Sequence, residues 1–266
     1  MTSEVARRHN VKLSGRGLQP MVFAHGFGCD QQMWRFVAPA FEDTHQVVLF
    51  DHVGCGGADS SRYDETRHAS LWGYAEDVLA LLEGLDLRDV VFVGHSVSAT
   101  IGLLAAIRSP ERFAQLVLVS PSPCYLNDPP DYVGGFERAD IDGLIDMMDR
   151  NLLGWANFLA PLVMDSRNPE ALTDELRASF CASDPYITRR FAMATFLSDH
   201  RADLAQVSVP SLVLQCSDDA IAPASVGAYM QAHLRDSHLH VLQAQWHCPH
   251  MTHAAETTAA IRAHLA

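Results

Sequence analysis

The sequence lacks several features that would tie it to a membrane or to an oxidising environment. No run of residues approaches the roughly 18 apolar residues of a membrane-spanning helix, and the first 17 residues contain no apolar stretch of the kind that directs export. The six cysteines form no CxxC pair, and the chain is too long to need disulfide bridges. We therefore expect a cytoplasmic protein with reduced thiols and no membrane association.

Positive charge is also scarce. The chain has 19 basic and 32 acidic residues, a net charge of −13, which argues against nucleic acid as a partner. Hydrophobic residues make up 48% of the 266 residues, enough to bury a large core, and α/β folds of this length commonly form one main domain. We expect one main domain.

Short apolar runs alternate with longer segments of helical period. Continuous apolar strands separated by helices are typical of a parallel sheet covered on both faces, so the sequence predicts an α/β fold. The predicted strands are residues 21–24, 46–50, 90–93, 115–119, 211–215 and 239–243. The predicted helices are residues 70–84, 97–108, 224–234 and 254–265.

This alternation stops between residues 122 and 200. No strand-like run occurs there, and helical stretches are interrupted by segments such as NDPPDYVGG. An insertion of about 80 residues between two strands of one sheet is too long for a plain loop. We expect residues 122–200 to form a helical lid subdomain, and residues 1–121 and 201–266 to form the core.

A serine stands where the predicted strand 90–93 runs into a predicted helix, in VVFVGHSVSATIG. In such a strand–turn–helix, the residue at the turn is lifted above the carboxyl edge of the sheet, where open α/β sheets bind ligands. Gly94 lets the backbone bend, so GHSVS is predicted to be a nucleophile elbow that exposes Ser96, with Ser98 in place of the usual final glycine. A serine that merely caps the following helix is the alternative.

A serine hydroxyl needs a base to take its proton and an acid to orient that base. After this kind of elbow the chain order is serine, then Asp or Glu, then His. QCSDDAIAP, which follows the strand 211–215, offers Asp218 and Asp219. We favour Asp219 because its spacing to Pro223 matches the usual acid loop, and Asp218 is better interpreted as a turn or helix-cap residue.

The base is expected after the last strand, where QWHCPHMTH offers three histidines. We favour His247, which comes first, where the chain would loop over the sheet edge toward the serine, and His250 is the alternative. His253 is expected at the start of the final helix. Three histidines could indicate a metal site, but no carboxylate or cysteine completes a recognisable ligand pattern, so we expect no metal and no other cofactor.

Acyl transfer also needs hydrogen-bond donors aimed at the oxyanion. FAHGFGCD follows the first confidently predicted strand, and its His25-Gly26 turn lets the backbone N–H of Phe27 face the site. The N–H of Val97, at the start of the predicted helix, is the second expected donor. Only backbone is required at these positions, so the Phe27 side chain is free to line the pocket.

Motifs along essentially the whole chain resemble one family of α/β-hydrolases. The family includes bacterial stress-signalling hydrolases of the RsbQ type and plant strigolactone and karrikin receptors, and the similar segments are FAHGFGCDQ, VVLFDHVGCGGADSSRYD, GHSVSA, SPSPCYLNDPPDYVGGFE, SDHRADL, LQCSDDAIAP and HCPHMTH. The resemblance implies an α/β-hydrolase core under a V-shaped lid of four helices. It also implies a catalytic triad of Ser96, His247 and Asp219, and the plant receptors resemble this chain at Ser98.

The same resemblance implies an apolar pocket between lid and core, lined by Phe27, Trp155, Phe158 and Phe196. Ordinary packing among lid helices is the alternative for these side chains. Trp246 departs from the family, in which glycine usually precedes the catalytic histidine. Because glycine accepts backbone angles that tryptophan disfavours, we expect a rearranged histidine loop, or an indole that narrows the pocket or covers a partner surface.

Two functions fit these observations. The first is a serine esterase or lactonase that cleaves a small apolar ester through an acyl-enzyme. The second is a signalling receptor that captures or slowly cleaves a small ligand and then engages a partner protein, since the family that this chain resembles contains both. A purely structural interaction module is disfavoured because three separated catalytic elements occur in the expected order.

Overall fold

Seven strands form one sheet in the order β1-β3-β2-β4-β5-β6-β7 within residues 4–164 and 167–266, which are the residues that the computed structural model describes. β1 is antiparallel to β3, and every other neighbouring pair is parallel. The strands are β1 (Lys12–Ser14), β2 (Gln19–Ala24), β3 (His45–Phe50), β4 (Val90–His95), β5 (Phe113–Val119), β6 (Ser211–Asp218) and β7 (Ser237–Gln245).

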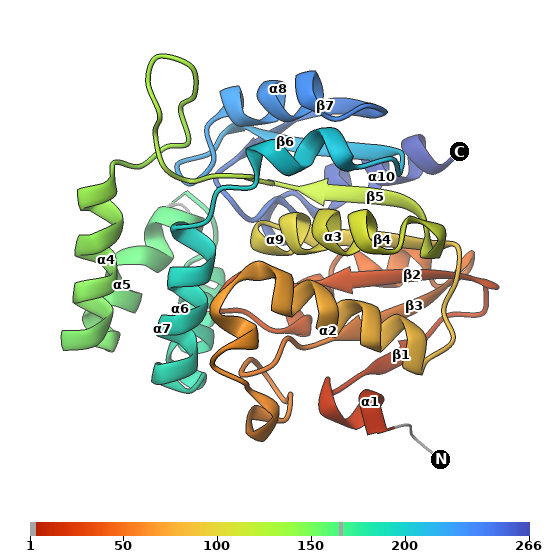
Figure 1. The fold of residues 1–266 in the computed structure, drawn as a ribbon, viewed down its shortest axis with the longest axis horizontal. Helices are drawn as coiled ribbons and strands as arrows, with labels where there is room; N and C mark the ends of the chain where they lie inside the picture. Colours follow the sequence, from red (N-terminus) through yellow and green to blue (C-terminus); the bar gives the residue numbers. More distant parts are fainter. Residues whose placement is uncertain (1–3, 165–166) are drawn as a thin grey trace.

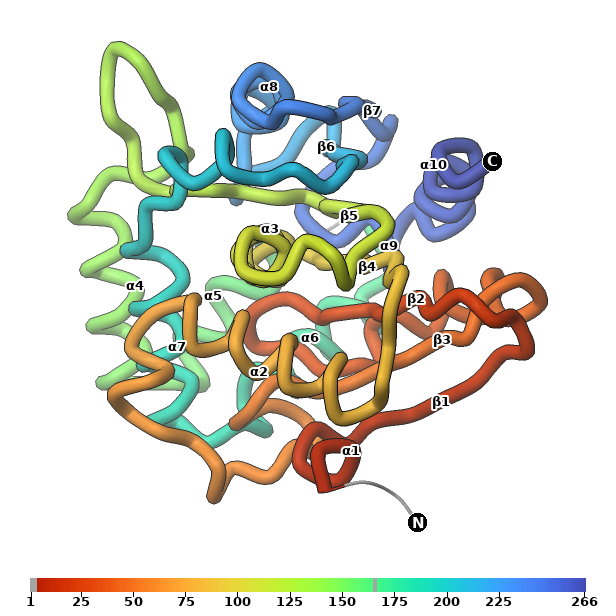
Figure 2. Tube along the Cα trace, turned by 45° about the vertical axis from the view of Figure 1, so that its right-hand side comes forward, coloured from red at the N-terminus to blue at the C-terminus, as the bar shows by residue number. Residues whose placement is uncertain are grey.

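Helices cover both faces of this sheet (Figures 1 and 2). On one face lie α2 (Leu71–Gly84), α3 (Val97–Arg108) and α8 (Ala224–His233), and on the other lies α10 (Ala254–Leu265). All six residues of the central strand β4 are buried, as expected for an apolar run between two helical layers. Two further helices, α1 (Glu4–Arg8) and α9 (Pro249–Thr252), are short.

The six predicted strands and four predicted helices are present, with ends shifted by a few residues. The sequence analysis missed β1, whose three residues are all exposed and show no apolar pattern. These residues pair with Val47, Val48 and Leu49 of β3, so only the tertiary fold makes them a strand. The predicted α/β fold is therefore confirmed.

Four helices stand between β5 and β6, at the carboxyl end of the sheet (Figure 1). They are α4 (Arg138–Arg150), α5 (Leu152–Met164), α6 (Glu170–Ala182) and α7 (Pro185–Phe196), here called the inserted helices. They lie within the predicted segment 122–200 and above the edge where Ser96 is expected. Across the described residues, no helix combines the length and apolar character needed to cross a bilayer.

Candidate active site

Ser96 lies in a sharp turn between β4 and α3. Its backbone angles, φ 55° and ψ −121°, are strained for a residue with a side chain, as expected at a nucleophile elbow. Gly94 permits this turn, because a Cβ atom there would lie 2.4 Å from the carbonyl oxygen of Ser98. The serine is therefore presented at the carboxyl edge of the sheet by the fold itself.

Three predicted residues meet at this edge. Nε2 of His247 lies 2.7 Å from Oγ of Ser96, and Nδ1 of His247 lies 2.9 Å from Oδ2 of Asp219. Oδ1 of Asp219 also accepts hydrogen bonds from the backbone N–H groups of Ile221 (2.8 Å) and Ala222 (3.1 Å), which fix the carboxylate. All three side chains are buried. The arrangement matches a serine–histidine–aspartate triad in geometry.

Two of the alternative residues lie apart from this triad. The Asp218 side chain is exposed at the end of β6, and its backbone carbonyl accepts a hydrogen bond from the N–H of Trp246 at 2.5 Å. His253 is the N-cap residue of α10, at the start of the final helix. The structure therefore places Asp219, and not Asp218, beside His247.

His250, the alternative base, is fully buried beneath the site. Its ring lies 4.5 Å from that of Trp34 and 4.3 Å from that of His95, and burial lowers its pKa to about 3. The ligand atoms of His95, Cys248 and His250 lie within 4.8 Å of one another, a grouping that the sequence analysis missed. All three side chains are buried, and burial raises the pKa of the Cys248 thiol well above its usual value.

The expected oxyanion donors lie on the two turns around Ser96. Val97 is the first residue of α3, so its N–H is one of those with no carbonyl partner inside the helix. Phe27 stands between two glycines. A Cβ atom at Gly26 would lie 2.4 Å from Nδ1 of His95, and Gly28 has a φ of 69°, so this close turn requires glycine at both positions.

Buried hydrogen bonds join these turns to each other. Oγ of Ser98 donates to the carbonyl of His25 at 2.5 Å, which ties the elbow to the turn that carries Phe27. Nε2 of His95 donates to the carbonyl of His247 at 2.8 Å, which ties the elbow to the histidine loop. Ser98, which replaces the usual glycine of the elbow, therefore connects the elbow to the turn that carries Phe27.

Sequence reasoning assigned no role to Tyr125, which touches the nucleophile. Its hydroxyl lies 3.1 Å from Oγ of Ser96, and the side chain is buried. Burial raises the pKa of Tyr125, so the phenol stays protonated and donates to Ser96 while Ser96 donates to His247. The available signal was its place in SPSPCYLND, directly after a strand that ends at the same sheet edge.

The free space above Ser96 is small and apolar, with a volume of about 30 Å³. Phe27 and Phe196 line it, and their ring centroids lie 5.5 Å apart. Trp155 does not line this space and packs behind Phe27 at 6.1 Å. The remaining apolar lining comes mainly from the inserted helices and includes Leu159, Val163, Leu176 and Phe180.

Two further residues expected to line the pocket, besides Trp155, lie elsewhere. Phe158 is 50% exposed and lines a separate outer groove of about 520 Å³, because α5 turns it away from Ser96. Trp246 adopts a φ of 73°, the left-handed conformation that suits glycine, and its half-buried indole does not line the space at Ser96. The histidine loop is thus not displaced, since His247 still reaches both Ser96 and Asp219.

Comparison with known proteins gives the same fold and family. Residues 19–254 match a family model described as alpha/beta hydrolase fold. A karrikin insensitive 2 receptor of Petunia hybrida is 39% identical over 93% of this chain and 92% of its own length. A strigolactone esterase of Pisum sativum is 37% identical over 95% of this chain and 94% of its own length.

A solved structure is similar along nearly the whole chain. The structure of a hydrolase from Oleispira antarctica superposes with a TM-score of 0.96 at 45% identity and covers 98% of this chain and 96% of its own. An esterase from Exiguobacterium antarcticum, at 19% identity and a TM-score of 0.89, shares the fold. The predicted resemblance to the plant receptors is confirmed, and the chain belongs to the α/β hydrolase family.

Proposed function

We propose that the protein is a serine hydrolase that cleaves a small, uncharged, apolar carboxylic ester or lactone through an acyl-enzyme on Ser96. The observation that carries this proposal is the unbroken hydrogen-bonded chain from Asp219 through His247 to Ser96. The strained conformation of Ser96 and the esterase names of similar proteins support it further.

The geometry suits a two-step acyl transfer. Nε2 of His247 takes the proton of Ser96 as Oγ attacks the ester carbonyl, and Asp219 orients the imidazole and stabilises its charged form. The backbone N–H groups of Phe27 and Val97 stabilise the oxyanion. His247 then gives its proton to the leaving alcohol, and a water activated by the same histidine releases the acid and restores Ser96.

The surroundings of Ser96 favour serine chemistry on an uncharged substrate. Two thiols, Cys29 and Cys248, line the same space, but burial raises the pKa of each well above its usual value, so both remain poor nucleophiles. His95 is kept neutral because burial lowers its pKa. No charged side chain other than the triad lines the space at Ser96 among the described residues, so a charged substrate would lose its hydration without compensation.

We further propose that the inserted helices, and with them residues 122–200, act as a lid. About 30 Å³ is room for one or two water molecules, whereas ligand pockets typically measure about 300–1,000 Å³. The walls formed by α5 and α6 must therefore move before an ester can reach Ser96.

Covalent labelling and turnover test the proposed chemistry. Ser96→Ala should abolish labelling by a fluorophosphonate probe and hydrolysis of p-nitrophenyl acetate, because the hydroxyl is the only nucleophile in the scheme. Ser217→Ala is the matched control, since Ser217 lies near the acid loop and its hydroxyl donates to the carbonyl of Ala244, away from the triad. Labelling of Ser96→Ala at the wild-type level would refute the proposal.

A second candidate function is a small-ligand signalling receptor with slow hydrolysis and a protein partner. It is favoured by the 39% identity to a protein named as a karrikin receptor. Turnover on p-nitrophenyl acetate and butyrate, measured beside ligand-dependent shifts in melting temperature, separates the two. Rapid turnover with small shifts favours the enzyme, and slow turnover with large shifts favours the receptor.

A further inference from the structure

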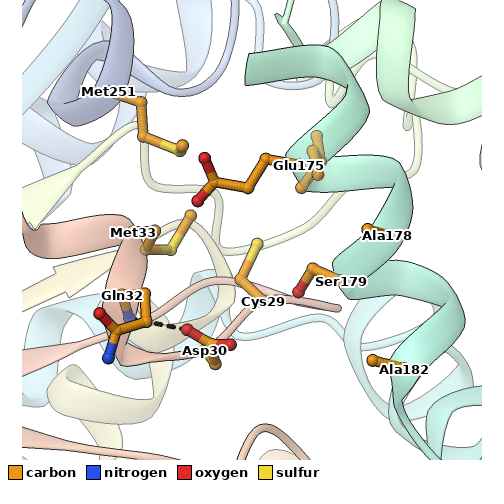
Figure 3. Close-up of a pocket in the computed structure, with 10 residues that line it drawn as sticks. Cys29, Asp30, Gln32, Met33, Glu175, Ala178, Ser179, Ala182 and Met251 are labelled. Carbon is orange, nitrogen blue, oxygen red and sulfur yellow. Dashed lines mark hydrogen bonds between the residues drawn. The ribbon is translucent and has the colours of Figure 1, made fainter. Parts of the chain in front are cut away.

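A second cavity of about 300 Å³ lies beside the catalytic space (Figure 3). The loop that follows Phe27, helix α6 and helix α9 surround it, with Cys29 on that loop and Ser179 next to it on α6. Cys29 and Leu176 line both this cavity and the space at Ser96. These two buried side chains therefore form the partition between the two spaces.

The catalytic space has larger cavities on two sides. The outer groove of about 520 Å³ shares Leu159 and Ile221 with the space at Ser96. The cavity of Figure 3 shares Cys29 and Leu176 with it. An ester has two arms, one on each side of the scissile bond, and a space of about 30 Å³ accommodates neither. The two arms would fit if the outer groove held one of them and the cavity of Figure 3 held the other.

Three polar residues of the second cavity are already engaged within the protein. Glu175 forms a bidentate ion pair with Arg35 (2.6 and 2.7 Å), the Asp30 side chain accepts from the N–H of Gln32 (2.7 Å), and Ser179 donates to a backbone carbonyl (2.8 Å). Because two carboxylates border the cavity and Arg35 is already paired with one of them, an anionic ligand is disfavoured.

The remaining lining is apolar and adaptable. Two methionines, Met33 and Met251, face the cavity from the core side, and Ala178 and Ala182 line it from α6 (Figure 3). Methionine side chains adjust to irregular apolar shapes more readily than branched ones. The lining therefore suits a flexible, uncharged hydrocarbon chain.

We propose that this cavity is an accessory site for one uncharged apolar arm of the ester, reached when the Leu176 side chain moves away from Cys29. The inference rests on the proposed esterase function and extends it to a substrate class. The preferred substrates carry a flexible chain of several methylenes on one arm. A chain that ends in a carboxylate is rejected.

Removal of the partition is the first test. Leu176→Ala should raise kcat/KM for p-nitrophenyl octanoate relative to acetate, or for octyl acetate relative to methyl acetate, by at least about tenfold, because the longer chain gains a second apolar cavity. Leu172→Ala, on the same helix but outside both cavities, is the matched control. Melting temperatures of both variants identify a change that only loosens the helix.

The second test fills the cavity of Figure 3 with a larger side chain at an exposed position. It leaves the buried partition residue Cys29 unchanged. Ala178→Phe places a ring in the cavity from an exposed position, while Ala171→Phe places one on the same helix away from it. Ala178→Phe should reverse the long-chain gain of Leu176→Ala and leave acetate hydrolysis within about twofold of its parent. Ala171→Phe should do neither.

The outcomes separate this inference from the proposed function. If the wild type hydrolyses acetate esters but neither Leu176→Ala nor Ala178→Phe changes chain-length preference in either series, the accessory site is refuted and the esterase stands. If the wild type hydrolyses no ester and Ser96 is not labelled, the esterase is refuted and the accessory site with it.

Discussion

The core and the inserted helices contribute different kinds of residues to the site. Ser96, Asp219 and His247 all come from the ends of core strands, while the inserted helices contribute mostly apolar walls. Every residue of β4 is buried, whereas α5 leaves Leu153 and Phe158 half exposed. The sheet therefore positions these three side chains, and in the proposed function the less buried inserted helices govern which molecules reach them.

Polar links between the two regions are specific. Arg35 of the core binds Glu175 of α6, and Ser179 of α6 donates to the carbonyl of Gly28. One link reaches the catalytic loop itself, because the backbone N–H of His247 donates to the carbonyl of Val163 in α5 at 3.2 Å. A movement of α5 would therefore affect His247 through this hydrogen bond. The core and the inserted helices are thus not fully independent.

The sharpest test of the core's part is the choice between adjacent aspartates. Asp219→Asn should lower ester turnover by up to about 10⁴-fold, since the orienting carboxylate of a triad contributes that much in the best-studied enzyme. Asp218→Asn should lower it by less than about threefold, because that side chain is exposed and does not reach His247. Steady-state kinetics on p-nitrophenyl acetate measure both, and the reverse ranking would mean that the acid was misassigned.

The sequence predicted the core better than the inserted helices for a physical reason. A strand buried on both faces needs a continuous apolar run, and an elbow needs Gly94 and a serine at a fixed spacing, so both leave local patterns. Phe158 and Trp155 lie on the same helix, yet one faces solvent and the other packs behind Phe27. That difference depends on how α5 rests on its neighbours, which no local pattern records.

Trp246 and Tyr125 illustrate two other limits of the sequence. The unusual tryptophan correctly marked a position that needs left-handed backbone, but the sequence did not show that the loop tolerates it. Tyr125 reaches Ser96 only because β4 and β5 are neighbours in the sheet. Strand order is a tertiary property, so the position of Tyr125 after a strand did not by itself assign it to the site.

Hydrogen exchange tests whether the two regions also differ in mobility. Amides of α5 and α6 should exchange at least about a hundredfold faster than those of β4 and β5, because local opening costs less where fewer apolar groups are buried on both sides. Exchange followed by mass spectrometry at neutral pH measures this ratio peptide by peptide. Equal protection in both regions would argue against a lid that opens.

Acid should weaken the core through its buried histidines. Burial lowers the pKa of His250 to about 3 and that of His95 well below its usual 6.5, so between these values the unfolded chain binds protons that the folded protein does not. Stability is therefore fully present above about pH 6.5 and is lost as the pH falls, by roughly tenfold in the unfolding equilibrium per pH unit for each histidine.

Urea denaturation at pH 7 and pH 5 measures this loss. His250→Phe should reduce the difference between the two pH values by one histidine's share, whereas His240→Phe, at an exposed position of β7, should leave it unchanged. A wild-type protein that is as stable at pH 5 as at pH 7 would contradict the assignment of neutral buried histidines to the core.

Trp246→Gly is expected to have the smallest effect. It tests whether a core residue next to His247 takes part in substrate selection. Glycine relieves a left-handed conformation that costs about 1–2 kcal/mol in other residues, but the half-buried indole loses packing of similar size, so stability should change little. The indole does not line the space at Ser96, so the ratio of kcat/KM for octanoate to that for acetate should stay within about threefold of the wild type, far below the change expected for Leu176→Ala. A large increase in this kcat/KM ratio would mean that the indole lies on the substrate's path. The core would then also contribute to substrate selection.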